Sequence, residues 1–108
     1  MNTTYTYFNS LVSQMPEIPP DSIISRTVFD DEQVKVVLFG FAAGQSLSEH
    51  TASQAAALHF LQGEADLTLG DDAVSVQAGA WIHMPPRLSH SVYAKTPAIM
   101  QLLLFKSG

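Results

Sequence analysis

The chain has 108 residues, of which 46% are hydrophobic and 14% charged, and this composition excludes a disordered protein and suits one globular domain. Five basic residues against ten acidic ones give a net charge of −5, and the scattered basic side chains form no stripe for nucleic-acid phosphates or an anionic membrane. The lack of cysteine excludes disulfides, zinc–thiolate sites and thiol catalysis.

The first 22 residues are polar and aromatic and end in a proline-rich stretch. Because proline fixes φ and has no backbone donor, this segment is predicted to be a lead-in and not a central strand. The N-terminus has no basic region followed by an apolar run, so no signal peptide is predicted. The longest apolar run near the end, residues 99–105, is broken by Gln101 and is too short to span a bilayer. We therefore expect a cytoplasmic protein with a lead-in at 1–22 and a folded domain at 23–108.

From residue 23 onward, short runs rich in β-branched and aromatic residues alternate with turns of glycine, proline and aspartate. The segment 52–61 is ambiguous, because its alanines favour a helix, and its second half is predicted as a strand from the β-like runs on both sides. The clearest local pattern is a hairpin around Gly70, Asp71 and Asp72. About eight strands predict an all-β sandwich or barrel, and a jelly roll fits the length. The predicted strands are 23–29, 34–41, the second half of 52–61, 67–69, 74–76, 80–84, 90–94 and 98–105.

The four histidines are His50, His59, His83 and His90, and none forms a helical pair. Two of them stand at a distinctive spacing from glycine and proline. Gly44 is followed after five residues by His50, and Gly63 comes thirteen residues later; Gly79 is followed after five residues by Pro85 and then by His90. This pattern resembles the two motifs of the small single-domain bacterial cupins, over residues 34 to 105. The resemblance implies a cupin-like jelly-roll β-barrel in which His50 and His90 project into the interior from neighbouring strands.

The chain departs from the cupin pattern at the other ligand positions. The family places a second histidine at position 52 and a glutamate at position 56, whereas this chain has Ala52 and Ala56. The resemblance therefore leaves His50 and His90 as the inherited metal ligands. Two neutral imidazoles without a carboxylate chelate a divalent ion weakly. We expect iron, manganese, nickel or zinc to be weakly held or absent.

The two alanines are predicted to leave space inside the barrel, and four side chains are candidates to line or fill a pocket there. Gln54 offers a carbonyl oxygen, Phe60 and Met84 offer apolar surface, and Arg87 could meet an anionic ligand at the barrel mouth. A solvent-exposed arginine is the simpler interpretation of Arg87. His59 and His83 are predicted to point to the far face of the sheet, as packing or interface residues.

The sequence is compatible with two functions. The first is a cupin that binds a small molecule, a weakly held divalent metal, or both, at His50 and His90. The second is a metal-dependent cupin enzyme, a dioxygenase or isomerase acting on a small carbonyl or phenolic compound. Because only a small fraction of the residues is charged, part of the protein surface should be apolar. A homodimer that covers such a surface is therefore expected. A lead-in carrying Tyr5, Tyr7 and Phe8 could cross to the partner and protect a sheet edge.

Overall fold

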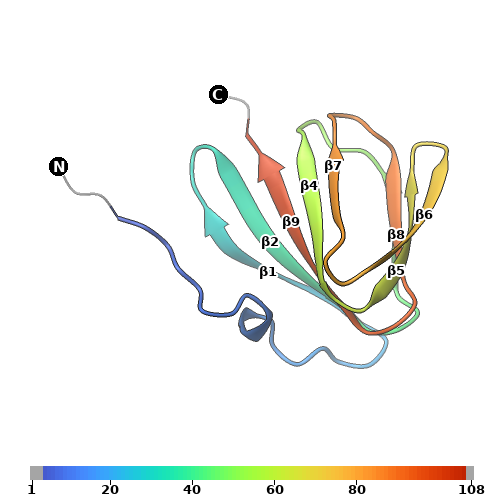
Figure 1. The fold of residues 1–108 in the computed structure, drawn as a ribbon, viewed down its shortest axis with the longest axis horizontal. Helices are drawn as coiled ribbons and strands as arrows, with labels where there is room; N and C mark the ends of the chain where they lie inside the picture. Colours follow the sequence, from blue (N-terminus) through green and yellow to red (C-terminus); the bar gives the residue numbers. More distant parts are fainter. Residues whose placement is uncertain (1–3, 107–108) are drawn as a thin grey trace.

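The structure, a computed structural model, describes residues 4–106. Figure 1 shows one β-barrel with the N-terminal segment leading away from it. Within the described residues there is no helix long and apolar enough to cross a membrane. In that range a short 3₁₀ helix, η1 (Val12–Gln14), precedes nine strands: β1 (Ile23–Asp30), β2 (Val34–Phe41), β3 (Ser46–His50), β4 (Ala56–Gln62), β5 (Glu64–Leu69), β6 (Asp72–Gln77), β7 (Trp81–Met84), β8 (His90–Ala94) and β9 (Ala98–Phe105).

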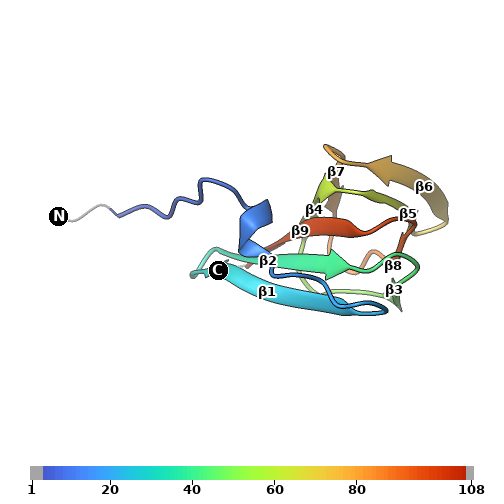
Figure 2. The ribbon, with the colours of Figure 1, turned by 90° about the horizontal axis from the view of Figure 1, so that it is seen from below.

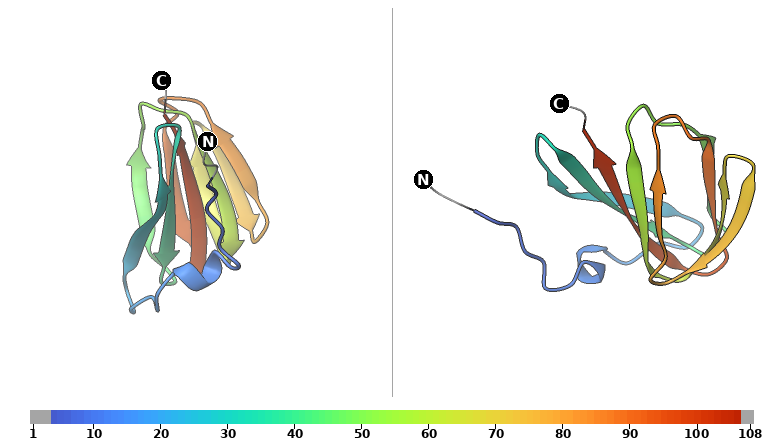
Figure 3. Two further views of the ribbon diagram at one scale, coloured as in Figure 1. Left: turned by 90° about the vertical axis from the view of Figure 1, so that its left-hand side faces the viewer. Right: turned by 45° about the horizontal axis from the view of Figure 1, so that its top comes forward.

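The strands form two sheets that face each other, as the right-hand view of Figure 3 shows. One sheet has five strands in the order β1-β2-β9-β4-β7, and the other has four in the order β3-β8-β5-β6. All pairings are antiparallel. The all-β jelly-roll prediction is thus confirmed, as are the hairpin, which is β5–β6, and the strand in the second half of 52–61. The alternation of apolar and polar residues did not predict β3, because four of its five residues are exposed.

The main core fills the space between the two sheets. Every second residue of each central strand points inward, so that side chains from the two sheets interdigitate. Phe41 and Phe60 are fully buried there and Leu67 is almost so. These inward-facing residues therefore fill the space between the sheets around the middle of the barrel.

A smaller apolar cluster lies on the outer face of the five-stranded sheet. Met15 from the lead-in packs with Leu38 and Ile99, and Ile18 lies against the same cluster. A Cβ on Gly40 would stand 2.8 Å from Ile18 Cδ1 and from Met15 Sδ, so glycine lets the lead-in approach the sheet closely. Figure 2 shows η1 next to this sheet. The lead-in thus covers part of the sheet's outer face.

The turn between β1 and β2 is organised by one carboxylate. Asp31 Oδ1 accepts hydrogen bonds from the backbone N–H groups of Gln33 and Val34, at 2.8 and 2.9 Å. These two bonds lower the pKa of the Asp31 carboxyl below its ordinary value of 3.8. The turn fixes the register of the hairpin at the edge of the five-stranded sheet.

Candidate functional site

His50 and His90 meet across the pairing of β3 with β8. The two residues are direct cross-strand partners, and their ring centroids are 4.2 Å apart with 57° between the ring planes. His90 lies in the inward-facing row of β8 with Val92 and Ala94, and its exposed fraction is 7%. His50 is exposed, at the end of β3. The sequence prediction that these two histidines lie on neighbouring strands agrees with this geometry.

A β-bulge accounts for the orientation of His50. Leu47 pairs with Val92, and the register shifts between Leu47 and His50. Regular alternation from Leu47 would turn residue 49 inward and residue 50 outward, and the extra residue of a bulge reverses that order. The Glu49 side chain instead points toward Ser89, because Glu49 Oε1 accepts a hydrogen bond from Ser89 Oγ at 2.7 Å.

Backbone carbonyls hold both rings in the same tautomer. His50 Nδ1 lies 2.8 Å from the carbonyl oxygen of Ser48, and His90 Nδ1 lies 2.9 Å from that of Leu88. A carbonyl only accepts, so each Nδ1 carries the proton and each neutral ring keeps its lone pair on Nε2. No buried side-chain nitrogen or oxygen in residues 4–106 lacks a partner, so the unpaired His90 Nε2 reaches a space open to solvent. Both imidazoles therefore have the tautomer of histidines that bind a ligand through Nε2, with Nδ1 hydrogen-bonded to a carbonyl.

Next to the two rings is a cavity of about 60 Å³, lined by residues of both sheets and of the loops at this end of the barrel. Two of the predicted pocket residues, Gln54 and Met84, line it with the two histidines, and so do Ala52 and Ala56. Its remaining lining is aliphatic: Pro85, Leu88, Leu102 and Leu104. The space predicted from the two alanines is therefore present, but it is small.

The other two predicted pocket residues lie outside this lining. Phe60 is fully buried in the main core. Arg87 is exposed and has a φ of +68°, a left-handed conformation that favours glycine. The Arg87 backbone N–H donates to the carbonyl oxygen of Ala52 at 2.7 Å, which ties the loop before β8 to the loop that follows His50.

His59 and His83 lie on the outer face of the five-stranded sheet, as the alternation predicted. His59 pairs with Trp81 in the register of β4 with β7, and His83 pairs with Ala57. His59 Nδ1 lies 3.3 Å from Gln101 Oε1, and the His83 ring stacks near that of Trp81 with centroids 6.5 Å apart. These two histidines are therefore separated from the cavity by the sheet itself.

The residues present do not fit the four-ligand divalent site that the cupin resemblance implies. No three histidine, cysteine, aspartate or glutamate side chains among residues 4–106 are placed to hold one ion together. The cavity lining contains no carboxylate that could compensate a double charge. What remains is a pair of imidazoles beside an amide, a thioether and an aliphatic wall.

Sequence reasoning missed part of the cavity wall. Leu102 and Leu104 come from β9, which lies next to β4. The alternation of β9 indicates that these leucines share a face, but only the strand order brings that face to the histidines. Leu88 precedes His90 by two residues, and its side chain lines the cavity while its carbonyl fixes the His90 ring.

Comparison with known proteins gives a family match and similar folds. Residues 37–105 match the family model described as the cupin domain, Cupin_2. The conserved SPY1581 protein of unknown function from Streptococcus pyogenes is 25% identical, with a TM-score of 0.84 over 100% of this chain and 94% of that one. A cupin superfamily protein from Desulfitobacterium hafniense is 23% identical, with a TM-score of 0.86 over 99% and 97%.

An RmlC-like cupin from Desulfovibrio desulfuricans has 24% identity and a TM-score of 0.81, covering 94% of this chain and 97% of its own. Among curated proteins, none matches the sequence. These similarities establish the barrel and its family, and they assign no reaction to the cavity.

Proposed function

The chain belongs to the Cupin_2 family, and on that premise we propose that it is a binding protein that holds a metal ion, or the polar end of a small molecule, at His50 and His90. The observation that carries this proposal is the matched pair of imidazoles. Each ring has its Nδ1 fixed by a carbonyl, at 2.8 and 2.9 Å, which leaves Nε2 free to bind.

The size of the cavity supports a small occupant. Sites for drug-sized molecules measure roughly 300–1,000 Å³, and the cavity beside His90 has about 60 Å³. That volume suits a single ion or one polar group of a ligand whose remainder stays outside, beside the exposed His50. Divalent iron, manganese, nickel or zinc would be held weakly, because two neutral ligands supply no compensating charge.

Binding accounts for these features better than the enzymatic alternative. An oxygen-activating iron site with open positions is typically held by two histidines and a carboxylate. At positions 52 and 56 this chain has alanine, and Gln54 is the polar side chain other than the histidines that reaches the cavity. The side chains around the cavity therefore suit binding, and none of them specifically supports the dioxygenase or isomerase alternative.

The proposal is tested by imidazole ¹⁵N NMR during titration with Zn²⁺ and, separately, Ni²⁺. We expect the free protein to show the Nδ1–H tautomer at His50 and His90, and weak binding to shift the Nε2 signals of these two residues. His50→Ala and His90→Ala should each abolish the response. His59→Ala and His83→Ala are matched controls from the outer face and should leave it unchanged.

Two results would contradict the proposal. One is a pair of site histidines that respond to neither metal, even at millimolar concentration. The other is a response that survives His50→Ala and His90→Ala but disappears in the outer-face variants. Circular dichroism of each variant verifies that the barrel is intact before its titration is interpreted.

A further inference from the structure

Three side chains with nitrogen or sulfur donors line the cavity together. His50 and His90 enter from β3 and β8 of the four-stranded sheet, and Met84 enters from the end of β7 in the five-stranded sheet. Resting on the proposed function of this site, we propose that its preferred ion is monovalent copper, Cu(I), held by the two imidazole Nε2 atoms and the Met84 thioether.

The charge of the surroundings favours a monovalent ion. The aliphatic wall offers no counter-charge, and His90 and Met84 are 7% and 3% exposed. Glu49, the acidic residue next to His50 in the chain, does not line the cavity, and its carboxylate accepts a hydrogen bond from Ser89. Because the cost of burying an ion rises with the square of its charge, Cu(I) has roughly a quarter of the desolvation penalty of a divalent ion of the same radius.

The donor atoms point to the same ion. Thioether sulfur is a soft ligand that selects Cu(I), and imidazole binds copper as well as zinc. Manganese and magnesium prefer carboxylate oxygens, and open iron sites use a carboxylate beside two histidines, whereas the cavity has no carboxylate from the described residues. A methionine that only fills core space would be replaceable by leucine, so the contribution of its sulfur can be measured directly.

Anaerobic competition with the Cu(I) chelator bicinchoninate tests this inference. We expect one Cu(I) per chain, bound more tightly than Zn²⁺. Met84→Leu should weaken Cu(I) binding by about tenfold or more, since even losing a ligand's hydrogen-bond partner typically costs that much. The same variant should leave Zn²⁺ binding and the unfolding midpoint nearly unchanged, because the two side chains have similar volume. X-ray absorption at the copper edge should show a sulfur neighbour in the wild type and none in Met84→Leu.

The outcomes separate this inference from the proposed function. If Zn²⁺ binds at His50 and His90 but Cu(I) binds no more tightly, or if Met84→Leu has no effect on copper, the Cu(I) inference is overturned and the binding site stands. If neither imidazole responds to any of the metals, both fall. His83→Ala is the control for adventitious surface binding, since its ring lies exposed on the far side of the sheet.

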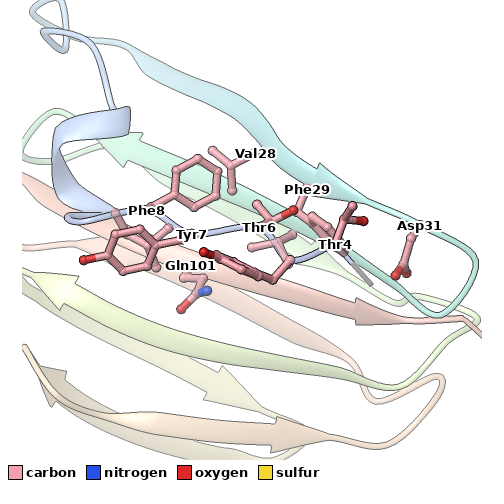
Figure 4. Close-up of a pocket in the computed structure, with 11 residues that line it drawn as sticks. Thr4, Thr6, Tyr7, Phe8, Val28, Phe29, Asp31 and Gln101 are labelled. Atoms are coloured by element: carbon pink, nitrogen blue, oxygen red, sulfur yellow. The ribbon is translucent and has the colours of Figure 1, made fainter. Parts of the chain in front are cut away.

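The site is separate from a groove of about 690 Å³ on the outer face of the five-stranded sheet, next to the N-terminal segment. Figure 4 shows this groove with Tyr7 and Phe8 of the N-terminal segment and Val28 and Gln101 of the sheet around it. Among residues 4–106, no histidine or methionine lines the groove, so it offers Cu(I) neither of the donors proposed for the site at His50 and His90.

Discussion

Gly63→Ala is expected to be among the most destabilising single substitutions in this barrel. Gly63 joins β4 to β5 with a φ of +87°, and a Cβ there would lie 2.7 Å from Ala98 Cα and closer still to the carbonyl oxygen of Pro97. The left-handed backbone costs a non-glycine residue about 1–2 kcal/mol. Displacing the backbone at Pro97 and Ala98 adds roughly 1–3 kcal/mol of overpacking. We expect the free energy of unfolding to fall by about 2–5 kcal/mol, the sum of these two costs.

Gly79→Ala separates the two contributions. Gly79 has a φ of +96°, and a Cβ there would meet nothing within 4 Å, so this variant carries the backbone cost without the collision. Urea denaturation of both variants should show Gly63→Ala as the less stable by at least about 1 kcal/mol. Equal losses would mean that the loop at Pro97 moves aside freely, and that the contact at Gly63 is not rigid.

Phe60→Ala has the second large expected effect. Phe60 is fully buried between the sheets and pairs with Met100 in the register of β4 with β9. Removing a buried phenyl ring loses its transfer free energy and leaves a cavity, at a cost of about 3–5 kcal/mol. That loss is a large fraction of the free energy of unfolding of a domain, which is about 5–15 kcal/mol. Thermal and urea denaturation measure the loss.

Phe105→Ala is the control for this substitution, because it removes the same ring from a strand end that is 38% exposed. Its loss should be well below that of Phe60→Ala. If the two variants lose equal stability, the core between the sheets is more plastic than its packing indicates. The same pair also bears on the predicted pocket: ligand or metal binding that is unchanged in folded Phe60→Ala agrees with Phe60 lying outside the cavity.

The strands were predictable from the sequence because alternation and turn residues are local signals. The hairpin around Gly70 is formed as expected, and the two histidines at motif spacing face each other with ring centroids 4.2 Å apart. β3 was missed because its side chains are mostly exposed and it bulges before His50. Solvent-facing strands with an irregular register leave little apolar alternation to detect.

Which residues line the cavity was not predictable from such local signals. Phe60 and Met84 both face inward on paired strands, yet only Met84 reaches the histidines, since Phe60 lies deeper between the sheets. That difference depends on position along the barrel axis, which strand order and register determine together. The tautomer of each histidine likewise depends on a backbone carbonyl two residues earlier in the chain, whose direction no residue pattern specifies.

The place of β9 has a consequence for how the barrel assembles in time. β9 is the last strand in chain order, yet it lies between β2 and β4 in the five-stranded sheet. Until it is synthesised, β2 and β4 each present an unpaired edge, and unpaired edges recruit other chains. Pairings between distant parts of a chain also form slowly. The nascent barrel therefore remains exposed to misassociation until residues 98–105 emerge, and we expect its yield in cells to depend on chaperone capacity more than that of a locally connected helical domain.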